Sequence, residues 1–212
     1  MRKPASKPVP ATATQGAARQ SVRIIGGAWR GRRLAFPVAE GLRPTPDRIR
    51  ETLFNWLQGR WSGVRVLDLF AGSGALGLEA LSRGAAAAVL VESNGAVTAQ
   101  LRATVTALGP ACVAATAIVQ TDGYRYLQGG ATLFDGVFLD PPFADGREAE
   151  LCTLLASRGW LAAGGWVYLE RAASRGAPSL PPGFMPWHEG RAGEVGFYLV
   201  RWDPSTNMST AT

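Results

Sequence analysis

The chain has 212 residues, of which 47% are hydrophobic, enough to bury the core of one domain. This composition excludes a chain that is disordered throughout. The first 50 residues hold 11 of the 22 basic side chains and 2 of the 16 acidic ones, so they carry a net charge of +9 against −3 for the rest. We therefore expect a basic N-terminal region that meets polyanions, joined to a domain with a different task.

The rare residue types exclude several kinds of chemistry. Both lysines, Lys3 and Lys7, lie at the N-terminus, so the body of the chain has none for a Walker phosphate loop or a Schiff base. One histidine and two cysteines are too few for a four-ligand structural zinc site, and we expect no metal. No G-x-S-x-G elbow accompanies His188, which argues against a serine hydrolase. Cys112 and Cys152 suggest no disulfide framework, so we expect a cytoplasmic protein.

No segment has the pattern of a membrane span or a signal peptide. Residues 1–21 contain Pro, Ala, Thr and four positive charges but no apolar stretch, which predicts a disordered basic tail. The longest uncharged stretch, residues 103–121, is interrupted by Gly109-Pro110 and therefore predicts the end of a helix followed by a strand. Residues 204–212 predict a disordered C-terminal tail.

After the basic tail, residues 22–37 predict a compact β-hairpin that carries several arginines. Thr45 is then placed as the N-cap of a helix over residues 46–58, with Pro46 in the first helical position and Asp47 in the first turn. The apolar residues of this segment recur with helical spacing at Ile49, Leu53, Trp56 and Leu57.

From residue 64 onward, apolar runs of strand length alternate with helical stretches. The predicted strands are residues 64–70, 88–92, 112–120, 134–140 and 166–172, and the predicted helices begin near Ala75 or cover residues 94–108, 123–128 and 147–157. A hairpin over residues 184–190 and 194–202 follows. The pattern predicts an α/β fold: a doubly wound, seven-stranded sheet with an antiparallel closing hairpin. We expect residues 22–60 to form an N-terminal unit of hairpin and helix, and residues 61–203 the main domain.

A glycine motif follows the first of these strands directly. Gly72, Gly74 and Gly77 form G-x-G-x-x-G, where backbone can approach a ligand beside the free N–H groups of a helix start. Such turns also occur for packing reasons, so the motif alone is a weak signal. Glu92 stands 20 residues past Gly72, at the end of the second strand, where it can accept hydrogen bonds from a ribose. Together these features predict a site for a nucleoside cofactor.

Asp68, near the end of the first strand, indicates which cofactor fits. Its carboxylate would repel the pyrophosphate of a dinucleotide but could accept hydrogen bonds from the α-ammonium group of S-adenosylmethionine. Its alternative role is to cap the N–H groups of the glycine loop. Asp122, after the third strand, could receive an adenine amino group, and its N-cap role for residues 123–128 is equally consistent with the sequence.

The most informative tetrapeptide is Asp140-Pro141-Pro142-Phe143, at the end of the fourth strand. Two prolines remove two N–H donors and stiffen the loop, so it offers the Asp140 carboxylate and the Pro141 carbonyl as acceptors. Two acceptors that bind the hydrogens of a nucleobase amine favour a pyramidal nitrogen, whose lone pair can attack a sulfonium methyl group. Phe143 offers a face for a base taken out of its stack. The structural alternative is a stiff loop with a capping aspartate.

Five segments, in order over about residues 22–202, make the chain resemble the RsmD family of bacterial 16S rRNA guanine-N2 methyltransferases. They are RIIGGAWRGRRL (23–34), GLRPTPDRIRETLFNWL (41–57), LDLFAGSGALGLEALSRGA (67–85), FLDPPF (138–143) and GWL (159–161). The resemblance implies a Rossmann-like class I fold and S-adenosylmethionine-dependent methylation of one guanine amino group, at position 966 in the usual rRNA numbering. The implied partner is the small ribosomal subunit or its assembly intermediates, and we expect a monomer.

The resemblance also implies roles for individual residues. Asp140, Pro141, Pro142 and Phe143 would bind the amine, and the implied cofactor site comprises Thr45, Arg48, Asp68, Phe70, Ala71, Gly72, Gly74, Glu92, Ser93, Asp122 and Gly123. Thr45 and Arg48 would reach the methionine carboxylate, although capping and surface charge explain these two nearly as well. In Glu92-Ser93-Asn94 the third position departs from the expected aspartate, which puts secondary adenine contacts in doubt.

The hairpin is the candidate surface for RNA, because guanidinium groups bind phosphates and a nearby indole can stack on an unpaired base. The candidate RNA-binding residues are Arg23, Trp29, Arg30, Arg32, Arg33 and Arg43. A solvated charged edge is the alternative interpretation of the same cluster. Trp187, His188 and Trp202 near the closing hairpin are expected to be packing residues.

Rival functions stay open at this point. A DNA adenine-N6 or cytosine-N4 methyltransferase would use the same acceptor-rich loop, but no segment is large enough for a DNA target-recognition domain. A noncatalytic RNA-binding assembly factor with a vestigial cofactor fold would fail to bind S-adenosylmethionine. A nicotinamide dehydrogenase is the weakest rival, because the chain offers no separate substrate domain.

Overall fold

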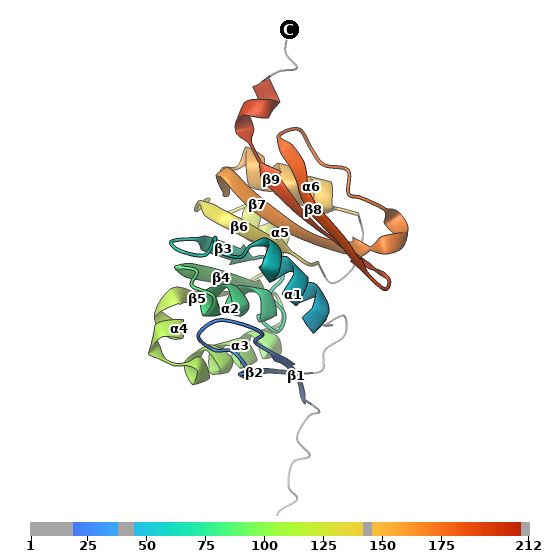
Figure 1. Cartoon of the computed structure of the whole chain (residues 1–212). Helices are drawn as coiled ribbons and strands as arrows, with labels where there is room; N and C mark the ends of the chain where they lie inside the picture. The colour runs from blue at the N-terminus through green and yellow to red at the C-terminus, as the bar shows by residue number, and fades with distance from the viewer. Residues whose placement is uncertain (1–18, 38–44, 142–145, 209–212) are drawn as a thin grey trace, which may run out of the picture.

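The computed structural model of the chain describes residues 19–37, 45–141 and 146–208 (Figure 1). A seven-stranded sheet, in the order β5-β4-β3-β6-β7-β9-β8, forms the centre of the molecule. Its first five strands in this order are parallel, and β9 runs antiparallel to both β7 and β8. The predicted doubly wound α/β sheet with an antiparallel closing hairpin is therefore confirmed.

Most helices and strands begin and end within a few residues of the predicted bounds. The strands are β1 (Arg19–Arg23), β2 (Arg33–Pro37), β3 (Arg65–Asp68), β4 (Ala87–Glu92), β5 (Thr116–Gln120), β6 (Phe134–Leu139), β7 (Leu161–Ala172), β8 (Phe184–Ala192) and β9 (Val195–Trp202). The α-helices are α1 (Asp47–Trp56), α2 (Ala75–Ser82), α3 (Gly95–Leu108), α4 (Pro110–Ala115), α5 (Gly123–Leu127) and α6 (Glu148–Ser157). Two short 3-10 helices cover Ala173–Arg175 and Pro204–Met208.

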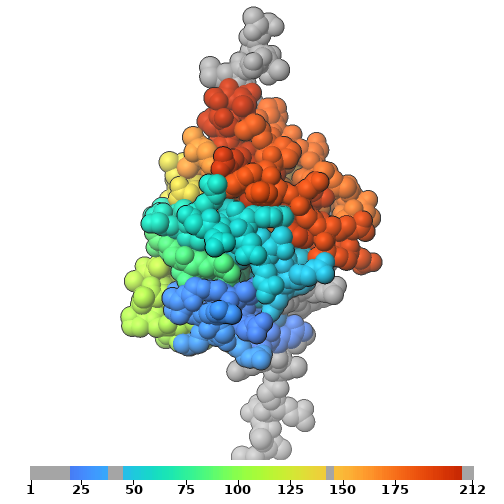
Figure 2. Space-filling model, viewed as in Figure 1, coloured from blue at the N-terminus to red at the C-terminus, as the bar shows by residue number. Residues whose placement is uncertain are grey.

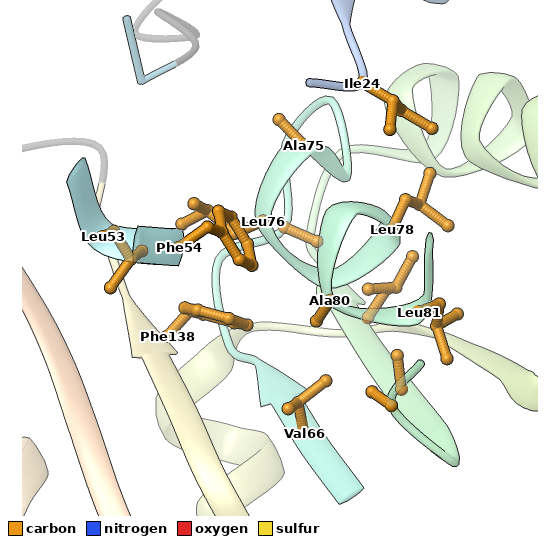
Figure 3. Packing of buried hydrophobic residues seen from close by; sticks show 14 of the residues in the cluster. Ile24, Leu53, Phe54, Val66, Ala75, Leu76, Leu78, Ala80, Leu81 and Phe138 are labelled. Carbon is orange, nitrogen blue, oxygen red and sulfur yellow. The ribbon is translucent and has the colours of Figure 1, made fainter. Parts of the chain in front are cut away.

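Alternation along the buried strands divides the apolar residues between two cores, one on each face of the sheet. The first core packs β1, β2, α1, α2 and α3 against strand residues that include Val66, Leu90, Phe138 and Tyr168 (Figure 3). The second core packs α5 and α6 against the intervening residues, which include Leu67, Val91, Val137 and Leu169. Near the carboxyl ends of β3, β6 and β7, the even-numbered residues Val66, Phe138 and Tyr168 face the first core, so polar residues that continue this alternation emerge on the same face.

Three segments differ from the sequence prediction. The strand predicted at 112–120 is wrong in its first half, because Gly109, with φ of 109°, ends α3 and Pro110 starts the short helix α4. Strand β7 begins at Leu161 rather than 166, with a shift of register opposite β6 near its start. The ends of the chain also carry more structure than expected, since β1 begins at Arg19 and a 3-10 helix occupies Pro204–Met208.

The N-terminal hairpin is part of the main body of the molecule. Val22, Ile24, Leu34 and Phe36 are buried in the first core together with residues of α2 and α3. In the space-filling view the hairpin (blue) lies directly against α1 (cyan), with no gap between them on this face (Figure 2). Burial of these alternate residues fixes which side of the hairpin faces the solvent.

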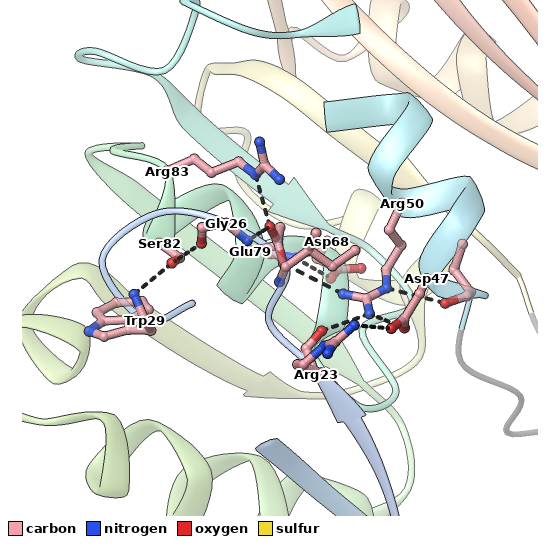
Figure 4. Close-up of polar contacts among 12 residues, drawn as sticks. Arg23, Gly26, Trp29, Asp47, Arg50, Asp68, Glu79, Ser82 and Arg83 are labelled. Carbon is pink, nitrogen blue, oxygen red and sulfur yellow. Dashed lines mark hydrogen bonds and ion pairs between the residues drawn. The ribbon is translucent and has the colours of Figure 1, made fainter. Parts of the chain in front are cut away.

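A buried ionic network fastens the hairpin and α1 to helix α2 (Figure 4). The Glu79 carboxylate accepts hydrogen bonds from the backbone N–H groups of Ile25 and Gly26 at 2.7 and 2.8 Å. It also accepts one from Arg83 Nε at 2.8 Å and lies 3.6 Å from Arg50 Nη1. Arg50 reaches Asp47 at 2.7 Å. We call these four side chains, Asp47, Arg50, Glu79 and Arg83, the Glu79 cluster.

The expected packing residues near the closing hairpin are confirmed. Trp202 is buried in the second core, and the ring of His188 stacks on Trp56 of α1 with a centroid distance of 5.1 Å. Trp187 packs against the first core, below the guanidinium group of Arg201.

Within the described parts of the chain, none of the helices has the length and apolar character that crossing a bilayer requires.

Candidate active site at the carboxyl edge of the sheet

The predicted site residues gather where the strand order reverses. From β3 the chain winds outward through β4 to β5 and then crosses back to β6 on the other side of β3. Ligands of open α/β sheets bind at this switch point, outside the carboxyl ends of the strands. Acidic residues lie near the carboxyl ends of β3, β4, β5, β6 and β7, namely Asp68, Glu92, Asp122, Asp140 and Glu170.

The glycine loop between β3 and α2 adopts a turn that needs glycine. Gly72 and Gly74 have φ of 49° and 75°, in the left-handed region. A Cβ atom at Gly74 would lie 2.7 Å from Leu101 Cδ2, and one at Gly77 would lie 2.3 Å from Leu90 Cδ2. The second and third glycines therefore allow α2 to pack closely on β4 and α3, as the packing interpretation of the motif expects. Ala71 N donates to the carbonyl of Val91 at 2.8 Å and ties the loop to β4.

Glu92 is held in a fixed orientation beside the loop. Its Oε2 accepts a hydrogen bond from Gly72 N at 3.0 Å, and its Oε1 accepts one from Asn94 N at 2.7 Å. Ser93 is exposed, with its hydroxyl 3.5 Å from the same Oε1. Each carboxylate oxygen has a second lone pair, so Glu92 can still accept hydrogen bonds from a ligand diol.

Asp68 takes the capping role that the sequence left open. The side chain is 2% exposed, and its Oδ2 accepts a hydrogen bond from Gly77 N at 2.9 Å, in the first turn of α2. Burial raises the pKa of Asp68 to about 7, although the Gly77 hydrogen bond opposes this and the charge of Glu92 adds to it. The proposed contact of Asp68 with an ammonium group stays a prediction.

Asp122 and Phe70 lie at the carboxyl edge of the sheet, next to the start of α5. Asp122 Oδ1 accepts a hydrogen bond from Arg125 N at 3.0 Å, so it caps α5, as one of its two interpretations expects. A Cβ atom at Gly123 would lie 2.8 Å from Phe70 Cε1, so the glycine allows this ring to pack on the start of α5. The ring of Phe70 also contacts Tyr124 edge to face, with a centroid distance of 6.4 Å. These residues place an aromatic wall beside the two carboxylates at the ends of β4 and β5.

Thr45 does not cap helix α1, and this part of the prediction is wrong. The helix begins after Pro46 without a side-chain cap, and Thr45 Oγ1 instead donates to Asp140 Oδ2 at 3.3 Å. The 5% exposed Thr45 therefore joins the segment before α1 to the end of β6. Arg48, one turn further along, is exposed. Pro142 and Phe143, predicted to bind the amine with Asp140 and Pro141, lie outside the described residues.

Sequence reasoning missed Glu170 and Tyr168, which lie beside Asp140. Strands β6 and β7 pair Leu139 with Leu169, so the next position in register places Asp140 level with Glu170. Glu170 is 8% exposed, and its Oε1 accepts a hydrogen bond from the Tyr168 hydroxyl at 2.8 Å. A glutamate two residues after an aromatic, at the point where an apolar strand segment ends, is the available signal.

The electrostatics of Asp140 follow from these neighbours. Burial raises the pKa of Asp140 well above its usual value, and the negative charges of Glu170 and then Asp68 raise it further. The Thr45 hydroxyl acts in the opposite direction by donating to the carboxylate. Burial also raises the pKa of Glu170, while hydrogen bonds from Tyr168 and Thr45 lower it. We call Asp68, Asp140 and Glu170 the carboxylate cluster.

The carboxylate cluster has hydroxyl donors but no ion pair. Among the residues that the structure describes, the ion pairs formed by Arg side chains leave out Asp68, Asp140 and Glu170. Such a site attracts a ligand that carries positive charge and hydrogen-bond donors, and it repels phosphates. An ammonium or sulfonium group and an aromatic amine fit this description, whereas the pyrophosphate of a dinucleotide does not.

The candidate RNA-binding arginines lie on the solvent side of the hairpin. Arg23, Arg30, Arg32 and Arg33 are exposed, and Arg43 lies outside the described residues. Arg32 donates to the carbonyl of Ala107 in α3 at 2.7 Å. The remaining candidate, Trp29, is half-buried against the first core, where its backbone N–H donates to Ser82 Oγ at 2.9 Å. Packing therefore explains Trp29, and its stacking on a base stays a prediction.

A polar groove lies between the hairpin and the start of α1. It has a volume of about 270 Å³ and runs between β1, β2 and the start of α1. Arg23 and Arg33 line one side, and Thr45, whose hydroxyl contacts Asp140, lines the other. Arg23 lies 3.5 Å from Asp47 across this groove. Two exposed guanidinium groups thus lie along a path that ends one hydrogen bond from the carboxylate cluster.

Comparison with known proteins adds independent information. The sequence model of the family described as Conserved hypothetical protein 95 matches residues 22–201. The chain is 44% identical over 180 residues to ribosomal RNA small subunit methyltransferase D of Escherichia coli strain K12, covering 85% of this chain and 89% of that protein.

Solved structures share the fold. The structure of yhhF from Escherichia coli, described as a candidate methyltransferase, superposes with a TM-score of 0.80 at 41% identity and covers 87% of this chain and 99% of its own. An RNA methyltransferase from Salinibacter ruber, in complex with S-adenosyl-L-homocysteine, has a TM-score of 0.56 at 17% identity and covers 76% of this chain and 95% of its own. At this lower identity the likeness concerns the fold alone.

Proposed function

Because the chain belongs to the RsmD family, we propose that it transfers a methyl group from S-adenosylmethionine to the exocyclic N2 amine of one guanine of 16S rRNA. The target is guanine 966 in the usual rRNA numbering, in the small subunit or one of its assembly intermediates. The names of the relatives support small-subunit rRNA as the substrate, and the family resemblance supports the choice of guanine.

The observation that carries the proposal is the carboxylate cluster at the switch point of the sheet. Asp68 and Glu170 are buried and Asp140 is half-buried, and three carboxyl groups without an ion pair among the described residues suit a cationic cofactor and an amine donor together. S-adenosylmethionine, when bound, supplies a methyl group on a positively charged sulfur. Its ammonium, its ribose hydroxyls and its adenine amine are all hydrogen-bond donors, which matches a site whose charged side chains are acceptors.

Several residues of this chain would hold the cofactor. Glu92, already oriented by Gly72 and Asn94, accepts hydrogen bonds from the ribose hydroxyls. The wall formed by Phe70 and Gly123 faces the adenine, and Asp122 accepts from its amine. Asp68 faces the ammonium group. The remaining proposed cofactor contacts are Thr45, Arg48, Ala71, Gly72, Gly74 and Ser93.

Asp140 and Pro141 prepare the amine of the base. The amine nitrogen of guanine shares its lone pair with the ring and is a poor nucleophile. Hydrogen bonds from its two protons to the Asp140 carboxylate and the Pro141 carbonyl favour a pyramidal nitrogen, which makes the lone pair available. Phe143 would stack on the base, and Pro142 would keep the loop rigid. Catalysis then depends mainly on positioning and electrostatics.

The RNA backbone would dock on the hairpin. Arg23, Arg30, Arg32 and Arg33, with Arg43, bind phosphates, and Trp29 offers an indole edge near them. The groove between Arg23, Arg33 and Thr45 provides a path from this surface to Asp140. A guanine extruded from its helix can then enter the site while its flanking phosphates stay on the hairpin.

The test is methyl transfer with a mapped product. Purified protein is incubated with methyl-labelled S-adenosylmethionine and small subunits that lack the modification, and the labelled nucleotide is identified by nuclease digestion and mass spectrometry. We expect label on N2 of a single guanine and none on large subunits or DNA. Label on DNA alone would favour the DNA amino-methyltransferase. Failure to bind S-adenosylmethionine by calorimetry would favour the noncatalytic assembly factor.

A further inference from the structure

We propose that Glu170, with its partner Tyr168, is a positioning residue of the methyl transfer, which makes Asp140 the acceptor of the proton that the amine loses. This inference rests on the proposed function and adds a residue pair that the sequence did not single out. It concerns only groups of this chain around the end of β6.

The chemistry leaves a proton to be placed. As the amine nitrogen bonds to the methyl carbon, the carbon–sulfur bond breaks and its electron pair stays on sulfur. The nitrogen, which then has four bonds, must lose one of its two original protons. Asp140 is expected to hold one of these protons in a hydrogen bond from the start, so its carboxylate is the nearest acceptor. A carboxylate with the usual low proton affinity would be a weak base for this step.

The arrangement of β6 and β7 places a second carboxylate beside the first. The pairing of Leu139 with Leu169 puts Asp140 and Glu170 side by side on the face of the first core. The hydroxyl of Tyr168 donates to Glu170 at 2.8 Å, two residues earlier on the same face of β7. Thr45 donates to Asp140 at 3.3 Å from the segment before α1. The Thr45 hydroxyl also interacts with Glu170, so two hydroxyl groups serve the two carboxylates.

The surrounding groups give this pair a defined electrostatic effect. Among the residues that the structure describes, the titratable groups facing Asp140 are Glu170 and Tyr168 on β7 and Asp68 on β3, and all three carboxyl groups are negative when ionised. The charge of Glu170 raises the pKa of Asp140 because it opposes a second negative charge nearby. Burial raises the pKa of Glu170, and the Tyr168 hydrogen bond opposes this rise and so favours the charged form. Because the groups interact, the two protons leave in steps that belong to the pair.

A purely structural role for Glu170 does not explain which groups surround its carboxylate. A buried glutamate that only packed would be expected to have a cationic partner, as Glu148 has in Arg171 at 3.5 Å on the opposite face of the sheet. Glu170 instead has Tyr168 as its donor and Asp140 as its neighbour. The geometry therefore points to an effect on the proton affinity of Asp140.

Two measurements on the full-length protein test the proposal. The first is the ¹³C-detected NMR titration of the Asp140 carboxyl group in the wild type, Glu170→Gln and Tyr168→Phe, without RNA. We expect the Asp140 pKa to fall by about one unit in Glu170→Gln, because a like charge is removed. Tyr168→Phe should lower the Asp140 pKa by less. Without the tyrosine hydroxyl, Glu170 binds a proton more readily, so its negative charge near Asp140 is reduced but not removed. Glu148→Gln, which removes a buried carboxylate from the other face, is the matched control and should leave the Asp140 titration unchanged.

The second measurement is the pH dependence of single-turnover methyl transfer to small subunits. The rate should rise with pH as Asp140 ionises, and in Glu170→Gln this rise should move to lower pH by about one unit. The rate at high pH should fall several-fold, because the base is weaker. Tyr168→Phe should show the same direction of change and serves as the deciding variant if Glu170→Gln does not fold.

The outcomes separate this proposal from the proposed function. An unchanged Asp140 titration in both variants would overturn the coupling. A shifted titration with a rate profile that coincides with the wild type would overturn its use in the reaction. Wild-type protein that transfers no methyl group to any small subunit would refute the proposed function, and the role in methyl transfer with it, even where the titration reveals the coupling.

Discussion

Two buried clusters of charged side chains in this protein differ in how their charges are balanced. In the Glu79 cluster the carboxylate is surrounded by two guanidinium groups and two backbone N–H donors. In the carboxylate cluster, Asp68, Asp140 and Glu170 have one N–H and two hydroxyl donors between them, and no cation among the described residues. The first cluster joins the hairpin and α1 to α2, and the second lies at the switch point of the sheet.

The difference separates two roles of charged side chains: the Glu79 cluster stabilises the structure, whereas the carboxylate cluster is available to bind a ligand. Paired charges hold elements in register, and removing one partner leaves the other buried alone. Like charges gathered without a cation destabilise each other, and their pKa values rise. Such perturbed groups are concentrated at functional sites. Neutralising a carboxylate should therefore have opposite effects on stability in the two clusters.

The largest effect is expected from Glu79→Gln. This change removes the charge that balances Arg50 and Arg83, and it replaces an acceptor with a donor beside two backbone N–H groups. The free energy of unfolding should fall by about 3–5 kcal/mol, measured by urea denaturation. Glu150→Gln, which breaks an exposed pair with Arg147, is the control and should leave the midpoint unchanged. A Glu79→Gln variant as stable as the wild type would show that the cluster is not what fastens the hairpin.

The next largest effect should be on turnover, from Asp140→Ala. Loss of the acceptor for the amine should lower the rate of methyl transfer by about 10²-fold or more, while affinity for S-adenosylmethionine, measured by calorimetry, stays within a few fold. Asp135→Ala, at the other end of β6, removes an acceptor for Arg65 N and should leave turnover close to normal. An unchanged rate in Asp140→Ala would remove this residue from the mechanism.

An effect confined to a defined pH window is expected from Asp68→Asn, which keeps an acceptor for Gly77 N. The folded-state pKa of Asp68, about 7, lies above the ordinary value of 3.8, so the folded protein binds the proton more tightly than the unfolded chain. Stability from this group is complete below about pH 4 and is lost as pH rises to about 7. Between these values the wild type should lose about 4 kcal/mol of unfolding free energy relative to Asp68→Asn, because the two pKa values differ by about three units and each unit corresponds to about 1.4 kcal/mol.

Parallel stability curves of these two proteins across that window would mean that Asp68 titrates normally. Only two of the three carboxyl groups in the carboxylate cluster would then have a raised pKa. Urea denaturation at closely spaced pH values measures both curves under the same conditions.

The smallest effect is expected on the surface. Replacement of Arg30, Arg32 and Arg33 by Ala should weaken binding to small-subunit RNA by about tenfold and reduce the salt dependence by about one unit for each lost phosphate contact. Binding is measured by filter retention across a salt series, with the exposed Arg102→Ala on α3 as the control. A salt slope equal to that of the wild type would show that the RNA docks elsewhere.

Much of the fold can be predicted because short sequence patterns indicate most of its strands, turns and helices. The apolar runs of β3, β4 and β6 and the glycine turn before α2 are visible in the sequence as strand, turn and helix signals. The segment 112–120 was misread because its apolar residues suit either a helix or a strand, and only Gly109 and Pro110 mark the new helix α4. Short apolar runs of this kind are ambiguous by periodicity alone.

The site was predictable only where residues follow strand ends in recognisable motifs. Glu92 and Asp140 could be identified in this way, and the structure places both at the switch point. Thr45 was assigned to a cap because the sequence does not show that Asp140 lies within reach of its hydroxyl. Glu170 and Glu79 escaped notice because their roles depend on pairing across strands and elements that are distant in the chain.

The most direct test of the central claim, that Asp140 receives the amine beside the methyl donor, is a crystal structure with S-adenosylhomocysteine bound. We predict that Glu92 accepts hydrogen bonds from the ribose, and that the Asp140 carboxylate faces the sulfur atom across a space open to a purine. A carboxylate that points away from the sulfur, or a site closed to any base, would contradict the account.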